Sequence, residues 1–210
     1  MTELDTSHAA RGARRRERTR TLVLDAVERM LADRSPDSIR IEDVAAEAGV
    51  SPASVYVHFG TKDGLVAATV ERLAEYVRDA LRTAYAAGST PFGQFQQAGV
   101  AYIRLLLDHP ALTRYLAGGG ISGLESSAEQ TLSERIAPLR EEFEQRIRAA
   151  IDAGEMIPTD ARRLSYFLLG AWGGVASLAL RDDAVALDAA EVERAVLEAS
   201  SALVVGLTAP

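Results

Sequence analysis

The feature that most constrains this chain is a helical spacing of apolar residues through almost all of its 210 residues. The first helix is expected to begin near Glu17, where apolar side chains start to recur every three or four residues, and to end before Ser35-Pro36. Further helices fit residues 41–48, 53–59, 61–87, 92–108, 110–117, 126–153, 160–181 and 189–207. Pro138 is expected to kink or divide one of them. No segment alternates like a strand for more than a few residues, so the predicted fold class is all-α.

Residues 41–59 have the pattern of a helix, a tight turn and a second helix. Gly49 ends the first of these helices, and Ser51 followed by Pro52 begins the second as an N-cap and a first-turn proline. The second helix is short and ends before Gly60, so it needs packing to be stable. This pattern is typical of a helix-turn-helix motif, whose second helix enters the major groove of DNA.

The second helix of this motif has distinguishable faces. Val55 and Phe59, four residues apart, are expected to face the first helix. Ala53 and Val57 then lie on the opposite face, where small and apolar side chains can approach base edges and thymine methyl groups. The helix start at Ser51 also directs a positive helix terminus at phosphate.

The net charge of −7 is distributed unevenly, which keeps nucleic acid among the expected partners. Residues 1–62 hold ten basic and ten acidic side chains, whereas residues 63–210 hold 13 and 20 and carry the whole −7. Residues 11–20 contain six arginines against one glutamate, and residues 48–62 contain no acid. Local windows of this kind can bind phosphate. The Arg-rich tail is either an arm on DNA or a solvated segment.

The segment SIRIEDVAAEAGVSPASVYVHFGTKDGL resembles the DNA-binding signature of the TetR family of bacterial transcriptional repressors. The AGVS turn, the Y-x-H-F run and the lysine that opens the next helix occur together, within a resemblance that covers about residues 18–75. Two positions depart from the common pattern. Val57 replaces an aromatic residue, and Arg40 replaces the threonine that usually opens the first helix of the motif.

The resemblance implies roles for individual residues. The residues implied to read bases are Ser51, Pro52, Ala53 and Ser54, with Val57 on the same face. The residues implied to hold phosphates are Tyr56, His58 and Lys62. Arg40 is expected to reach phosphate rather than to cap its helix.

The resemblance also divides the chain into a DNA-binding domain at residues 1–65, with the Arg-rich tail, and a ligand-binding and dimerisation domain at 66–210. Apolar pocket walls with a few polar anchors are typical of small-molecule sites. The candidate ligand-binding residues are Tyr102, Arg104, His109, Phe143 and Trp172. Residues 160–207 are expected to form a homodimer, because Leu164–Leu180 is apolar on every face and Val192, Val196, Ala199 and Leu203 form a second apolar stripe.

Several other activities are excluded or disfavoured. The chain has no cysteine and three widely separated histidines, so no disulfide, no metal site and no cofactor is expected. The GxGxxG match at residues 118–123 follows a helix instead of a strand, which argues against a dinucleotide site. No catalytic residues are expected and the protein is not predicted to be an enzyme. The N-terminus lacks the apolar segment of a signal peptide, and the apolar run at 164–180 is interpreted as a buried interface, so a cytoplasmic location without a membrane is expected.

The predicted function is that of a dimeric transcriptional regulator that releases a pseudo-palindromic operator when a small molecule of unknown identity binds. The helix that opens near Thr61 would connect the two domains and transmit this change. The alternative is an all-α protein that binds small apolar molecules without binding an operator.

Overall fold

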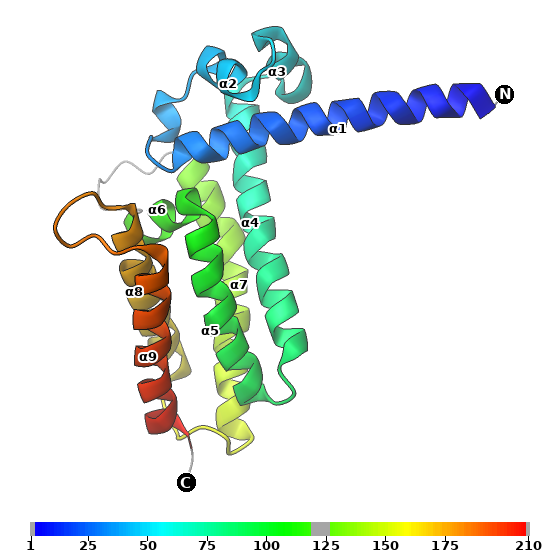
Figure 1. The fold of residues 1–210 in the computed structure, drawn as a ribbon. Coiled ribbons are helices and arrows are strands. Elements are labelled where there is room, and N and C mark those ends of the chain that lie inside the picture. The colour runs from blue at the N-terminus through cyan, green and yellow to red at the C-terminus, as the bar shows by residue number, and fades with distance from the viewer. Residues whose placement is uncertain (1–2, 119–126, 209–210) are drawn as a thin grey trace. The chain divides into compact units, whose positions relative to one another are not determined.

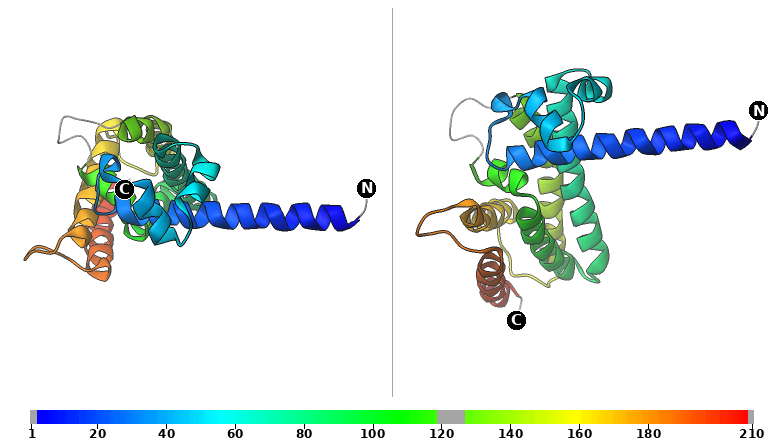
Figure 2. Two further views of the ribbon diagram at one scale, coloured as in Figure 1. Left: turned by 90° about the horizontal axis from the view of Figure 1, so that it is seen from above. Right: turned by 45° about the horizontal axis from the view of Figure 1, so that its top comes forward.

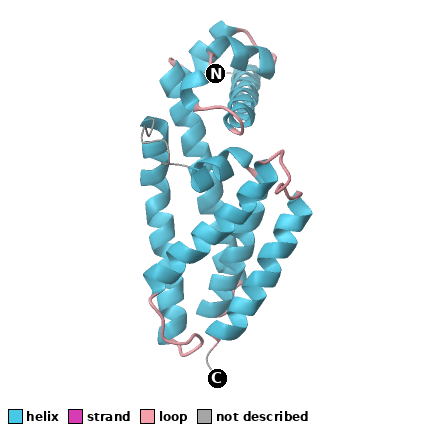
Figure 3. Cartoon of the chain, turned by 90° about the vertical axis from the view of Figure 1, so that its left-hand side faces the viewer, coloured by secondary structure: helices cyan, strands magenta, loops and turns pink. Residues whose placement is uncertain are grey.

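The computed structural model describes residues 3–118 and 127–208, and within them the regular structure is helical (Figures 1 and 3). The helices, in chain order, are α1 (Glu3–Leu31), α2 (Ile41–Ala48), α3 (Pro52–Phe59), α4 (Lys62–Ala87), α5 (Pro91–Asp108), α6 (Pro110–Gly118), α7 (Ser127–Asp152), α8 (Ala161–Ala176) and α9 (Ala189–Leu207). Two short 3-10 helices, η1 (Pro36–Ser38) and η2 (Ser177–Leu180), follow α1 and α8. The predicted fold class is confirmed, and most predicted bounds lie within one or two residues of these.

The chain divides into two compact units, residues 1–71 and 72–210, with the division inside α4. In the first unit, α1 packs against α2 and α3. Its core is formed by side chains of each helix, including Val23, Val27, Val44, Val55 and Leu65. An exposed ion pair, Arg29 to Glu47 at 3.0 Å, also joins α1 to α2.

The first helix is longer than expected. It begins at Glu3 and not near Glu17, so the Arg-rich tail is helical. The added segment lacks an apolar stripe, but its alanines and arginines are strong helix formers and it contains no proline. Figures 1 and 2 show that this part of α1 projects beyond α2 and α3.

In the second unit, α5 makes its most extensive contact with α7 and also packs against α6, α8 and α9. The largest fully buried side chains of this unit include Ile103, Leu106, Leu112, Ile147 and Met156. Figure 1 shows α8 and α9 side by side, and their residues are in contact. The C-terminal end of α9 is joined to the loop after α7, because the N–H of Ile157 donates to the carbonyl of Leu207 at 2.8 Å.

Two helices differ in detail from the sequence-based expectation. Helix α7 continues through Pro138, which neither ends nor divides it. Pro138 lies on the exposed side of α7, so the carbonyl that loses its helical donor can be solvated. The helix expected over 160–181 ends as an α-helix at Ala176 and continues as η2, where the Ser177 hydroxyl donates to the Gly174 carbonyl at 2.7 Å.

Candidate nucleic-acid interface and ligand cavity

The turn between α2 and α3 is held by backbone geometry and one cap. Gly49 has φ 66°, a left-handed conformation that glycine adopts without strain, and the N–H of Val50 donates to the Ala45 carbonyl at 2.9 Å. The Ser51 hydroxyl then accepts from the N–H of Ser54 at 3.2 Å and begins α3, with Pro52 in its first turn. The sequence predicts this local structure because each part of it depends on neighbouring residues only.

Helix α3 buries one side and leaves the other open. Val55 is fully buried, and Phe59 is half-buried beneath the Arg20 guanidinium, 5.2 Å from the ring centre. Ser51, Pro52 and Ala53 are exposed at the start of the helix.

The outward face of α3 is uncharged. Val57 is 82% exposed and Tyr56 is 48% exposed, whereas Ser54 and His58 are half-buried. A single exposed valine is common on protein surfaces. Together with the exposed Tyr56 and the small residues at the start of the helix, it gives α3 an uncharged face that can approach base edges closely.

The cations beside α3 differ in availability. Arg40 occupies the N-cap position of α2 without a side-chain cap bond, and it is exposed. The half-buried Lys62 donates to the Asp37 carbonyl at 2.7 Å and so connects the start of α4 to η1. An ammonium group has three donors, so Lys62 keeps two that can reach a phosphate.

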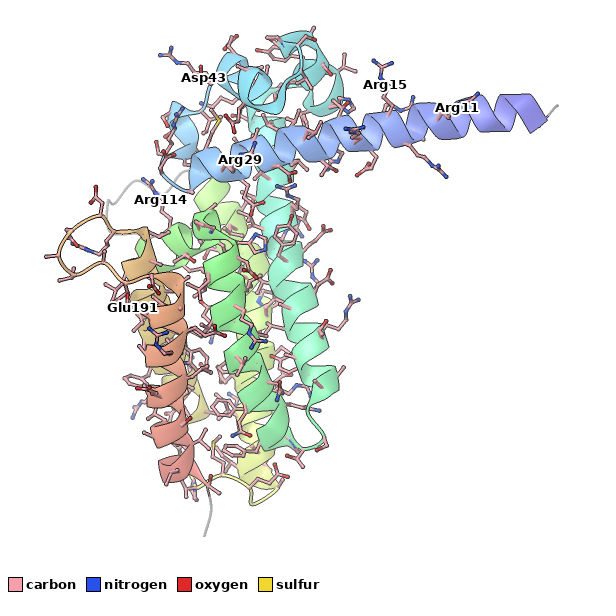
Figure 4. The ribbon with its side chains drawn as sticks, in the orientation of Figure 1. Arg11, Arg15, Arg29, Asp43, Arg114 and Glu191 are labelled. Carbon is pink, nitrogen blue, oxygen red and sulfur yellow. The ribbon has the colours of Figure 1, made fainter. Side chains whose placement is uncertain are left out.

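The arginines of α1 are available to solvent. The exposed members are Arg11, Arg14, Arg15, Arg16 and Arg18. Figure 4 shows Arg11 and Arg15 on the part of α1 that projects beyond α2 and α3. Both alternatives for this segment, contact with DNA and solvation, stay predictions.

Lys62 provides a direct test of phosphate contact. Lys62→Ala should weaken binding to all DNA sequences about equally and reduce the salt slope by about one. Because Lys62 is the only lysine in the chain, an amine-reactive reagent can modify it and the N-terminus alone. Bound DNA should protect Lys62 from the reagent. Unchanged affinity, slope and labelling would remove Lys62 from the DNA contacts and leave its bond to Asp37 as its role.

The second unit contains a cavity of about 250 Å³ among residues of α4, α5, α6, α7 and α8. Tyr102, Phe143 and Trp172 line this cavity, so the structure brings three of the five candidate ligand-binding residues together. Trp172 lies close to α5, because a Cβ atom added at Gly99 would be 2.9 Å from the indole ring. The indole N–H donates to the Ser200 hydroxyl at 3.3 Å.

The other two candidates lie outside this cavity. Arg104 is exposed and forms an ion pair with Glu193 at 3.3 Å. His109 stacks on Tyr76 with ring centres 4.2 Å apart. Sequence reasoning assigned both residues from their chemistry alone, without knowledge of the direction in which each helix face points.

Two cavity-lining residues with polar side-chain groups, Arg140 and Tyr166, were missed. Arg140 lines the cavity, and its guanidinium lies 4.8 Å from the ring centre of Tyr166, which also lines it. A sequence signal exists for Arg140, because Arg140, Glu144 and Arg148 are spaced i, i+4 and i+8 on the helix that carries the Leu139 and Phe143 stripe. The described residues contain no group of three metal-ligating side chains.

Helices α8 and α9 expose many apolar side chains. Phe167 is 60% exposed and Val205 is 80% exposed, and Tyr166, Leu197 and Leu203 are also open. The expected stripe on α9 is divided, because Val192 and Val196 are buried inside the chain while Ala199 and Leu203 are exposed. In length and composition Ala161–Leu180 could cross a membrane, a property it shares with core helices of soluble proteins.

A capped turn, a short helix with an open uncharged face and a separate helical unit with a cavity define a helix-turn-helix protein. Residues 23–69 match the family described as "Bacterial regulatory proteins, tetR family". The helix-turn-helix segment of this chain is therefore similar to that of TetR-family regulators.

Relatives and solved structures extend this comparison. An HTH-type transcriptional regulator of Mycobacterium tuberculosis strain H37Rv is 31% identical over 117 residues, which are 53% of this chain and 58% of the regulator. The match therefore spans little more than half the length of this relative. The fold is similar to that of the ketosteroid regulator KstR2 of M. tuberculosis, with TM-score 0.69, 16% identity and coverage of 91% and 95% of the two chains. AibR in complex with isovaleryl coenzyme A and operator DNA has TM-score 0.69, 15% identity and coverage of 86% and 97%.

Proposed function

We propose that this protein is a ligand-responsive transcriptional repressor that binds a pseudo-palindromic operator as a dimer in the cytoplasm. The observation that carries this proposal is the outward face of α3, where Val57 is 82% exposed beside small residues at the helix start. A helix with such a face can approach base edges closely in the major groove. The TetR-family match over residues 23–69 covers this same motif.

The proposed DNA contacts fall into two groups. The start of α3, from Ser51 to Ser54, reads base edges together with Val57, while Tyr56, His58 and Lys62 hold the backbone. Arg40 adds a phosphate contact from the start of α2, where its side chain is exposed. This division is supported by the difference in chemistry, since phosphate contacts position a protein and base contacts specify the sequence.

The proposed control depends on the cavity of the second unit. A ligand in the cavity favours a conformation in which the two copies of α3 no longer match successive major grooves. The ligand can shift this equilibrium only by its differential affinity for the two conformations. The similarity to AibR, whose structure holds both a coenzyme A ester and operator DNA, supports an effector-controlled operator contact.

The proposed dimer forms through residues 160–207. Tyr166, Phe167 and Leu203 are exposed on α8 and α9, and such surface is a liability in a monomer. Gly170 and Gly174 are exposed on α8, where a partner helix can approach closely.

The alternative function is that of an all-α protein which binds small molecules without binding an operator. An electrophoretic shift with the DNA upstream of the protein's own gene distinguishes the two functions. A specific, salt-sensitive shift supports the repressor, and a shift no stronger than that of unrelated DNA supports the alternative.

Val57→Glu should reduce operator affinity by about 100-fold or more, because it places a carboxylate against DNA at the centre of the outward face. Val57 is too exposed for the change to disturb the core. Ala137→Glu is the control, since it introduces the same carboxylate at an exposed position of α7 that lies outside the proposed dimer interface. Equal affinity of the two variants, measured by fluorescence anisotropy, would contradict the placement of α3 on DNA.

A further inference from the structure

We propose that the cavity binds an apolar carboxylate, and that Arg140 holds the carboxylate group of this ligand. The inference rests on the proposed function in treating this cavity as the effector site. It adds the chemical class of the effector and the residue that selects it.

The cavity wall is apolar and aromatic apart from one cation. Aliphatic side chains from α4 and α7 and the rings of Tyr102, Phe143, Tyr166 and Trp172 surround the space. Arg140 is the only charged residue among the described residues that line it. At roughly 30 Å³ for each water-sized group, about 250 Å³ holds a ligand of about eight non-hydrogen atoms.

Arg140 is held in place with most of its donors unused. Its side chain is 20% exposed, and its Nη1 donates to Oε2 of Glu144 at 3.2 Å. The guanidinium also lies over the Tyr166 ring at 4.8 Å. A guanidinium has five N–H donors in a planar fork that matches a carboxylate. A fixed, mostly buried arginine can therefore offer two parallel N–H groups to a ligand with little loss of entropy.

The neighbouring carboxylates do not occupy the cavity. Glu144 is buried and is shared between Arg140 and Arg148, and it does not line the cavity. Glu141 is 3.9 Å from Arg140, but its side chain is 65% exposed and its charge is solvated. The charge that faces the ligand is thus the positive charge of Arg140.

A second polar group belongs to the same cavity. Tyr102 is 8% exposed, and it lines the cavity. Burial raises the pKa of this hydroxyl above its usual value, so the phenol stays neutral and can donate a hydrogen bond. A buried hydroxyl of this kind is stabilised by an acceptor such as a carboxylate oxygen.

The rings could also surround a quaternary ammonium group, as aromatic cages do. Such a cation would lie beside the positive charge of Arg140, and the described residues that line the cavity include no carboxylate to balance the two charges. Repulsion from Arg140 therefore favours the anion over the cation.

The test is calorimetric titration of the full chain, without DNA, with hexanoate, hexanamide and choline. Hexanoate and hexanamide have the same number of non-hydrogen atoms and differ in charge. Hexanoate should bind about tenfold or more tightly than hexanamide, which lacks the charge-assisted bonds, and choline should not bind. Arg140→Gln should remove the preference for the acid, and Arg140→Lys should restore part of it because the charge returns without the fork.

Arg148→Gln is the matched control. It removes the same charge and the other partner of Glu144, but Arg148 does not line the cavity and its side chain is 59% exposed. Thermal unfolding checks that both variants fold. The proposal is overturned if the acid and the amide bind equally, if neither binds, if choline binds more tightly, or if Arg148→Gln loses the preference as Arg140→Gln does.

The proposed function can fail separately. Carboxylate binding through Arg140 in a protein that does not shift operator DNA would support this inference and contradict the repressor. If a neutral or cationic effector releases the operator and hexanoate does not bind, the repressor function is supported and the carboxylate site is contradicted.

Discussion

Gly174→Arg should convert the protein from a dimer to a monomer of 22.5 kDa and abolish operator binding. Gly174 is exposed on α8, and an added Cβ atom would meet nothing within 4 Å inside the chain. The change is thus compatible with the folded chain and even removes a poor helix former. At the proposed interface, however, it inserts a large cation between two helices. The loss of binding would follow from the loss of the second α3, because one short helix contacts too few base pairs for useful specificity.

Ala137→Arg is the control for this variant. Ala137 is exposed on α7, outside the proposed interface, so its replacement should leave both the dimer and operator affinity unchanged. Sedimentation at micromolar concentration measures the assembly, and circular dichroism shows whether the helices persist. A parent protein that sediments as a monomer, or a Gly174→Arg variant that stays dimeric, would contradict the assignment of residues 160–207 to the interface.

Insertion of five base pairs at the centre of the operator should destroy binding. Two copies of α3 related by a twofold axis require an inverted repeat whose half-sites lie about one helical turn apart, roughly 34–36 Å, or a multiple of it. Five base pairs turn one half-site by about half a turn to the opposite side of the duplex. Insertion of ten restores the side but lengthens the span, so recovery requires a flexible dimer.

Footprinting of the three operators measures this effect. On the parent operator, we expect protection of two symmetric half-sites. After the five-base-pair insertion, we expect that neither half-site is protected at the same protein concentration. A single asymmetric half-site that is unaffected by the insertion would contradict the twofold symmetry.

The helices themselves could be predicted from the sequence because their signals are local. Apolar spacing located α5 and α9, while Gly49 and the Ser51-Pro52 pair located the turn before α3, all from interactions within a few residues. The predicted start of α1 was wrong because the sequence of its first turns contains no apolar stripe, and only helix propensity indicates them.

The neighbours of each side chain depended on the tertiary structure. Arg104, His109 and Arg140 are equally plausible anchors by residue type, but only Arg140 lines the cavity, because α7 turns it toward α4, α5 and α8. Likewise, the bond from Lys62 to Asp37 joins residues 25 positions apart. The sequence by itself determined the helices and the turn of the motif, since periodicity and caps act along the chain. The packing of helices distant in sequence decided which charge faces the cavity and which apolar residues stay exposed, since these contacts form only through space.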